Sequence, residues 1–249
     1  MKLQIAMLFE LGPNDQGILG GGVENHIFNL SLELIKMGHK VFWITGAIPN
    51  NKRRINIKGI EIIRLDLLSL ISRTFNSQQL FFSRQLLFLV RNFMQFLKDS
   101  IDLPSIDIFH GHVYSSGLSA LFLSKITNRP VINTIHGSYY QYWHEMANPI
   151  VALIYRHLEK FLSVFLANKC HYQIHTDVAF YNLVKSWCKA NIRHKVVSIL
   201  NGVNLNLFHP NVKPVREIKE NEGPVIVTTR RLVYKNGVRF LVKAFKDVI

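Results

Sequence analysis

The chain has 249 residues, 48% hydrophobic and 18% charged, a composition that is too apolar for a disordered chain and sufficient for a sizeable core. Its two cysteines, Cys170 and Cys188, are too few for a disulfide framework or a Cys-x-x-Cys site, and we interpret both as buried, idle thiols in a reducing cytosol. The net charge of +14 indicates an anionic partner, but the basic residues form no single block and no nucleic-acid motif accompanies them, which argues against nucleic acid.

The N-terminal segment predicts a buried strand, a glycine-rich loop and a helix. Positions 2–9 are mainly apolar, glycines are frequent at positions 12–22, and a helical apolar spacing begins at Val23 and stops at Gly38. Glycines let a backbone approach a ligand, and free N–H groups at a helix N-terminus favour an anion. We therefore predict a phosphate or sugar site here; the alternative is a flexible loop that needs glycine only for its turn.

The spacing of these glycines argues against two common nucleotide folds. It matches neither Gly-x-Gly-x-x-Gly nor Gly-x-x-x-x-Gly-Lys-Ser/Thr, and the second predicted strand ends in Ile-Thr-Gly at 44–46 without an acid to hold a ribose. A nicotinamide oxidoreductase and a P-loop nucleotidase are both disfavoured.

Apolar, β-branched runs alternate with helical patterns along the rest of the first 200 residues. This order is typical of an α/β fold, here a Rossmann-like, doubly wound parallel sheet with helices on both faces. The expected strands are residues 2–9, 40–45, 60–65, 106–110, 131–136, 172–175 and 196–200.

Residues 80–98 form a helical pattern rich in Leu and Phe, in which Arg84, Arg91 and Lys98 recur every seven residues and share one stripe. A core-packing helix with a solvated stripe is the favoured interpretation. An in-plane helix at an anionic membrane is the alternative. No uncharged apolar run is long enough to predict a transmembrane span.

Histidines follow two neighbouring strands of the predicted sheet, in Asp-Ile-Phe-His-Gly-His at 107–112 and Thr-Ile-His-Gly at 134–137. Ligands of an open parallel sheet bind outside the carboxyl ends of its strands, so we expect His112 and His136 to face the glycine loop. Side chains alternate between the faces of a strand, and on that ground we do not expect His110 and His112 to converge. We interpret His110 as a packed strand residue, and without a third ligand we predict no zinc site.

A linker and a second domain are predicted after the last strand. Prolines and a charged run occupy 210–224, and a buried strand, a basic turn and a helix start follow from 225 to 249. We place the boundary between 205 and 206, so that residues 206–249 open an incomplete domain. In the basic turn of this incomplete domain, Arg231 and Lys235 are suited to bind a diphosphate. A solvated basic turn without a ligand is the simpler alternative.

Four motifs, taken in chain order, carry a resemblance to a known family. They are Gly-Gly-Val-Glu at 21–24, Asp-Ile-Phe-His-Gly-His at 107–112, Asn-Gly-Val-Asn with Phe-His-Pro at 201–210, and Arg-Leu-Val-Tyr-Lys-Asn-Gly-Val at 231–238. Together they resemble the retaining glycosyltransferases of family four, which have the GT-B fold of two Rossmann-like halves. The chain would then hold the N-terminal half and the start of the C-terminal half.

The resemblance assigns roles to individual residues. It implies that His112 lies beside the reacting sugar as the catalytic residue. Arg231, Lys235 and the backbone at Gly22 would bind the donor phosphate. The acceptor would be bound by Gly21, Glu24 and His136. Neither a cofactor nor a metal is expected, because the cations at the phosphates supply the charge, and the leaving phosphate takes the acceptor's proton.

The chain departs from the family pattern in two ways. Asn236 stands where the family has its phosphate-binding lysine, and Lys235 lies one residue earlier. The family's Glu-x7-Glu motif, which holds the donor's sugar and ribose, would lie beyond Ile249. We therefore expect these 249 residues alone to have little transferase activity.

The sequence as a whole predicts an enzyme that transfers a sugar from a nucleoside-diphosphate sugar to a glycan or lipid-linked acceptor, such as a surface polysaccharide precursor. The expected place is the cytoplasm, with peripheral contact to the inner face of the cytoplasmic membrane. The alternative is a non-catalytic module that binds anionic surfaces or glycans.

Overall fold

The computed structural model describes residues 1–46, 50–65, 105–212, 226–230, 232 and 236–246. The chain divides into two compact units, Met1–Asn201 and Gly202–Ile249. The boundary predicted between 205 and 206 lies close to this division and stays a prediction. The helix predicted over 80–98 lies outside the described residues.

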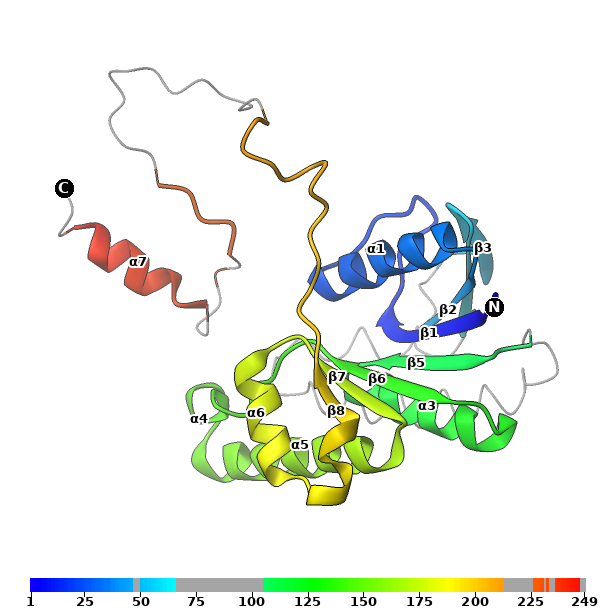
Figure 1. Ribbon diagram of the computed structural model, residues 1–249. Helices are drawn as coiled ribbons and strands as arrows, with labels where there is room; N and C mark the ends of the chain where they lie inside the picture. Colours follow the sequence, from blue (N-terminus) through cyan, green and yellow to red (C-terminus); the bar gives the residue numbers. More distant parts are fainter. Residues whose placement is uncertain (47–49, 66–104, 213–225, 231, 233–235, 247–249) are drawn as a thin grey trace. The chain divides into compact units, whose positions relative to one another are not determined.

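The first unit is built on one eight-stranded sheet, in the order β3-β4-β2-β1-β5-β6-β7-β8 (Figure 1). All neighbouring strands run parallel except β3 and β4. The strands are β1 (Gln4–Leu11), β2 (Lys40–Gly46), β3 (Arg54–Ile57), β4 (Ile60–Leu65), β5 (Ile108–His112), β6 (Val131–Ile135), β7 (Tyr172–His175) and β8 (Val196–Ser198). The strand order reverses at β1, whose neighbours are β2 and β5, and this confirms the predicted doubly wound α/β fold.

The described helices lie on both faces of this sheet. One face carries α1, and the other carries α3, α5 and α6 (Figure 1). Right-handed crossovers account for this arrangement, because the chain winds outward from β1 in opposite directions in its two halves. The helices of the first unit are α1 (Gly22–Lys36), α3 (Val113–Thr127), α4 (Trp143–Met146), α5 (Pro149–Lys169), α6 (Val178–Trp187) and the 3-10 helix η3 (Ala190–Lys195).

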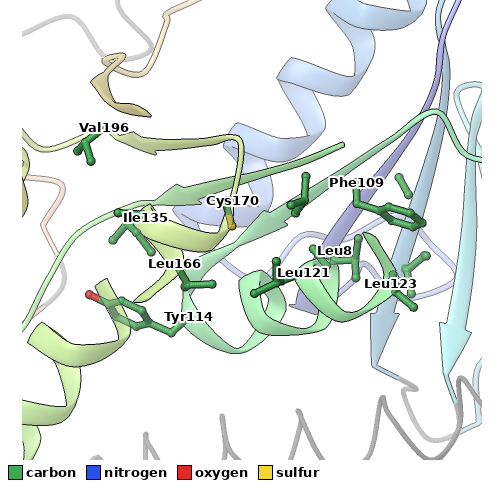
Figure 2. Packing of buried hydrophobic residues seen from close by; sticks show 14 of the residues in the cluster. Leu8, Phe109, Tyr114, Leu121, Leu123, Ile135, Leu166, Cys170 and Val196 are labelled. Carbon is green, nitrogen blue, oxygen red and sulfur yellow. The ribbon is translucent and has the colours of Figure 1, made fainter. Parts of the chain in front are cut away.

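Each face of the sheet has its own hydrophobic core. Leu8 of β1 packs with α3 and α5, in the cluster that Figure 2 shows around Leu121 and Leu166. Its neighbour Met7 points to the opposite face and packs with Ile27 of α1. Successive residues of β1 are thus buried on both sides, as expected of a central parallel strand, and each fully buried aliphatic side chain stabilises the fold by about 1.5–3 kcal/mol.

The first helix and the cysteines agree with their predictions. α1 ends at Lys36, and Gly38 follows in a left-handed conformation with φ +89°. Cys170 and Cys188 are buried and unpaired, and burial raises the pKa of Cys170 to about 12. A thiol with so high a pKa is unreactive near neutral pH.

The strand β3 was not predicted from the sequence. It pairs antiparallel with β4 across a two-residue turn, Lys58-Gly59, whose residues both have positive φ, 51° and 87°. Such a turn is favoured by Asn-Gly and tolerates lysine at some cost, so the turn signal in the sequence was weak.

The second unit contains one described helix, α7 (Val238–Phe245), with no buried residue. Residues 226–230 were predicted as a buried strand, but they are exposed and lie outside any sheet. A strand needs a neighbour to pair its backbone groups, and the part of this unit that is described supplies none. Across the described ranges of both units, every helix is too short or too polar to span a membrane.

Candidate functional site

Four histidine side chains gather at the carboxyl ends of β5 and β6. His110 and His112 come from β5, His136 follows β6, and His26 lies on α1. The ring centroids are 4.3 Å apart for His110 and His112, 5.2 Å for His112 and His136, and 4.8 Å for His26 and His136. This edge lies beside the point at which the strand order reverses, where parallel sheets bind their ligands.

The structure corrects the prediction for His110 and His112. Both are in β5, yet their rings stack with an interplanar angle of 27°. The alternation of side chains has a period of two, so residues i and i+2 of a strand share a face, and the expected divergence was wrong. The interpretation of His110 as a packed strand residue holds, since it is buried and its Nε2 lies 2.7 Å from Thr134 Oγ1.

Burial keeps these imidazoles neutral. Desolvation lowers the pKa of His110 to about 4 and that of His136 to about 3, and it holds the pKa of His112 well below its usual value. The neighbouring histidines add to each of these shifts, because a second positive charge nearby is unfavourable. Near neutral pH the cluster therefore offers hydrogen-bond donors and acceptors without charge.

The ring of His112 is fully buried, and its Nδ1 lies 2.9 Å from His136 Nε2. Its Nε2 is buried and has no hydrogen-bond partner among the residues that the structure describes. His136 is partly exposed. His136 therefore faces outward, and the buried His112 lies beneath it. The Nε2 of His112 remains without a hydrogen-bond partner among the described residues.

A strained turn fixes the position of His112. The next residue, Val113, has φ +62°, a region that costs a β-branched residue about 1–2 kcal/mol. With its amide nitrogen toward them, the fully buried Asn133 donates to the carbonyl oxygens of Val113, at 3.0 Å, and Gly111, at 2.9 Å. Gly117 makes room for this amide, because a Cβ there would overlap it. Asn133 therefore holds the strained turn in place.

Relief of this strain should stabilise the protein. We expect Val113→Gly to raise the free energy of unfolding by about 1 kcal/mol, because glycine adopts positive φ without a steric penalty. Val164, also half-buried but in the middle of α5, provides the control, and Val164→Gly should cost about 1 kcal/mol or more. Urea unfolding of both variants measures the two effects; equal destabilisation would contradict the strained turn.

The loop after β6 is held by a buried carboxylate. Glu159 of α5 is 2% exposed and accepts hydrogen bonds from Ser138 Oγ at 2.8 Å and the Tyr139 N–H at 3.2 Å. Trp143 Nε1, at 2.8 Å, and the Tyr114 hydroxyl, at 3.2 Å, also donate to it. Desolvation raises the pKa of Glu159 although these donors oppose the shift. The network ties the loop that begins with His136 to the middle of α5.

The first half of the glycine-rich loop is held by hydrogen bonds from Arg64, and the second half leads into the uncapped start of α1. Arg64, which is 1% exposed, donates to Asp15 Oδ1 and, at 2.7 Å, to the Pro13 carbonyl oxygen. The hydrogen bond from Arg64 lowers the pKa of Asp15. Among the residues that the structure describes, no side chain caps the start of α1 at Gly21, so its first N–H groups are oriented for an acceptor atom. The Glu24 carboxylate lies beside Gly21, and it would have to move to admit a Cβ there.

A cavity of about 270 Å³ lies between α1 and the sheet, and it shares His26 and His110 with the cluster. Its lining is otherwise mainly aliphatic, with Leu30 of α1 and Ile108 and Ile132 of the sheet among its residues. This apolar wall is one physical cause of the low pKa values of the histidines.

The structure brings together some of the predicted site residues and leaves others undescribed. Gly21, Gly22, Glu24, His112 and His136 all lie at the carboxyl edge of the sheet or at the start of α1. Arg231 and Lys235 lie outside the described residues. Their roles, and that of His112 in catalysis, stay predictions.

Three residues of this site were not predicted from the sequence: His26, Asn133 and Glu159. The helical spacing from Val23 placed His26 one turn into α1, which was the available signal for it. Asn133 lies in an apolar strand and Glu159 among the charged residues of a helix, and only tertiary contacts give them a function. Within the described ranges, no three His, Cys, Asp or Glu side chains are placed to hold a metal ion, and the expected independence from metal stays a prediction.

Comparison with known proteins identifies relatives of this chain. The model of the family described as Glycosyltransferase Family 4 matches residues 20–207. The chain is 27% identical to a human protein that is one of the subunits of phosphatidylinositol N-acetylglucosaminyltransferase, over 89% of the chain and 41% of that protein. It is 29% identical to the Arabidopsis thaliana protein of the same name, over 92% of the chain and 46% of that protein. The chain thus spans less than half the length of these relatives.

Solved structures share the fold. Sucrose-phosphate synthase from Thermosynechococcus elongatus superimposes with a TM-score of 0.60 and 19% identity, over 84% of this chain and 50% of that one. At this identity the likeness concerns the fold alone.

Proposed function

Since the chain belongs to glycosyltransferase family 4 and has the Rossmann-like fold of a GT-B half, we propose that it forms the acceptor side of an enzyme that transfers a sugar from a nucleotide sugar to a lipid-linked acceptor. The neutral histidine cluster beside the open start of α1 carries this proposal. The names of the two relatives support an N-acetylglucosaminyl donor and a phosphatidylinositol acceptor.

The acceptor is held mainly by uncharged groups in this proposal. The outward side of the His136 ring and the backbone N–H at Gly21 bind its hydroxyls, the N–H at Gly22 binds the donor phosphate, and His112 orients the ring of His136 through their 2.9 Å contact. A neutral imidazole both donates and accepts, which suits a hydroxyl. The low pKa values matter because an imidazolium could only donate, and it would then be unable to accept the hydrogen bond of an acceptor hydroxyl.

The donor side supplies the charge. Arg231 and Lys235 bind the diphosphate, whose negative charge grows as the bond to the sugar breaks. The acceptor hydroxyl attacks from the face that the diphosphate leaves, and the departing phosphate oxygen takes its proton, so that configuration is retained. In this proposal His112 lies beneath the place where the sugar is transferred, and its buried Nε2 has no hydrogen-bond partner among the described residues.

A transfer assay tests the proposal on the product of the complete natural coding region. Radiolabelled UDP-N-acetylglucosamine and phosphatidylinositol vesicles are supplied, and labelled lipid is counted after extraction. We expect His112→Ala and His136→Ala to lower the rate by about a hundredfold or more, the usual effect of removing one positioned donor. His194→Ala, at an exposed histidine of η3, is the control and should keep the full rate.

Two results would count against this function. Full activity of both cluster variants would remove the histidines from the reaction, and failure of the parent protein to transfer any sugar to a lipid would remove the activity itself. The 249-residue chain alone is expected to transfer little sugar, because the resemblance assigns the donor's sugar and ribose to residues outside it; rapid transfer by the purified chain would contradict that expectation.

A further inference from the structure

The outer side of α5 carries an apolar stripe that packs against no other helix or strand of the described structure; within α5, the ring of Phe161 stacks on that of Phe165 at 5.9 Å. Ile150, Leu153, Ile154 and Phe161 have exposed fractions of 73%, 55%, 56% and 62%. Their spacing of three, four and seven residues places them on one side of the helix. A surface helix normally has polar residues there.

The opposite side of α5 packs against the rest of the first unit. Ala152, Glu159, Ser163 and Leu166 are buried against the rest of the unit. The helix is also fixed by its Asn148 cap, whose side chain accepts from the Val151 N–H at 3.0 Å. The outer stripe is therefore not needed to hold α5 in place, and its exposure calls for a partner.

The charged side chains of α5 outside its buried side are all positive. Arg156 and Lys160 lie beside the stripe, both on the same side of it, and each lies over an aromatic ring, at 4.8 Å from the centre of Tyr140 and 5.3 Å from that of Trp187 respectively; the Nε of Arg156 is buried. The one acid of α5, Glu159, is buried on the inner side. Together with the chain's net charge of +14, this pattern is complementary to an anionic surface.

We propose that this side of α5, called here the α5 stripe (Ile150, Leu153, Ile154 and Phe161), docks in the plane of an anionic membrane. The aliphatic and aromatic side chains enter the boundary between headgroups and acyl chains, and Arg156 and Lys160 contact lipid phosphates. This inference rests on the proposed function, which places the acceptor in a lipid layer.

The topology gives the docked helix a catalytic consequence. α5 begins on the loop that leaves the carboxyl end of β6, so Ile150 lies toward the edge that carries His136. Glu159 fixes the same loop to α5 through Ser138 and the Tyr139 N–H. A membrane on the stripe would therefore keep the histidine edge near the headgroups from which an acceptor is taken.

Flotation with vesicles tests the stripe on the 249-residue chain, using phosphatidylcholine with and without phosphatidylserine. We expect binding to the anionic vesicles only, and we expect Ile154→Ser/Phe161→Ser to lower the partition coefficient by about tenfold or more. Ile126→Ser/Tyr172→Ser is the matched control, since Ile126 and Tyr172 are also exposed, at 53% and 49%, but lie on α3 and β7. The control should bind like the parent.

A second variant separates insertion from charge. Ile154→Lys/Phe161→Lys adds positive charge to the stripe; weaker binding than the parent's would support insertion, whereas equal or stronger binding would overturn it. Equal loss in the serine pair and its control would also overturn the proposal. So would a parent chain that binds no vesicles, or one that is dimeric in solution and becomes monomeric in the serine pair, since the stripe would then be a protein interface. The assay contains no sugar donor, so its failure leaves the proposed transfer reaction untouched.

Discussion

Between about pH 7.5 and pH 5 the chain is expected to lose several kcal/mol of its free energy of unfolding. The cause is a set of histidines that folding buries wholly or in part. The pKa values of His110 and His175 are lowered to about 4 and that of His136 to about 3, in each case mainly by desolvation. In the unfolded chain each takes up a proton near pH 6.5, while in the folded chain it stays neutral. Stability is therefore full above pH 6.5 and falls as the pH drops toward 4.

The contribution of one residue can be isolated. For His110, which is 8% exposed, a folded pKa of about 4 corresponds to a loss of about 2 kcal/mol at pH 5. His110→Gln retains a polar side chain for Thr134 without a titrating ring, so its loss between the two pH values should be smaller by about that amount. His194→Gln, at an exposed histidine, should leave the loss unchanged. Urea unfolding at both pH values measures these differences; identical pH dependence in His110→Gln and the parent would contradict the burial argument.

Gly111→Ala is expected to destabilise the fold by about 3 kcal/mol, the upper end for overpacking. A Cβ at Gly111 would lie 2.6 Å from Gly117 Cα and 2.7 Å from the Ser116 carbonyl oxygen, and both are backbone atoms of α3. Backbone atoms cannot rotate away as a side chain can, so α3 would have to shift from β5. The same shift would open the turn at Val113.

Gly20, which has free space where a Cβ would stand, provides the control for Gly111→Ala. No atom lies within 4 Å of a Cβ built on Gly20, and its φ is not positive, so Gly20→Ala should change the free energy of unfolding by less than about 0.5 kcal/mol. Thermal or urea unfolding of the two variants is sufficient. If Gly111→Ala were as stable as Gly20→Ala, the close approach of α3 to β5 would be wrong.

Most of the sheet could be predicted because its strands are buried on both faces. Runs such as residues 4–9 and 131–135 are largely apolar, and their order along the chain with intervening helices determines a parallel sheet. β3 was missed because it is a short edge strand with half-exposed side chains, so it lacks the apolar run that marked the others.

The site was predictable only where it follows from topology. His112 and His136 stand at the ends of neighbouring strands, and parallel strands bring their carboxyl ends together. The turn at Gly111–Val113 was not predictable in this way. The positive φ of Val113 and the hydrogen bonds that Asn133 donates to this turn both depend on the contact between α3 and β6. That contact joins residues that are not neighbours in the sequence. The motif showed that a glycine separates two histidines; the reason for that glycine is a contact with α3.

The central place of β1 has a consequence for synthesis on the ribosome. Its partner β2 is made soon after it, but its other partner, β5, begins at Ile108, after residues 66–107 have been added to β4. At about 5–20 residues per second, the open edge of β1 has no partner for several seconds. That edge includes Ala6, Met7 and Leu8, which are almost wholly buried once β5 pairs. An unpaired apolar edge is a template for a foreign strand, so the nascent first half of this protein should be a substrate for chaperones that shield such edges.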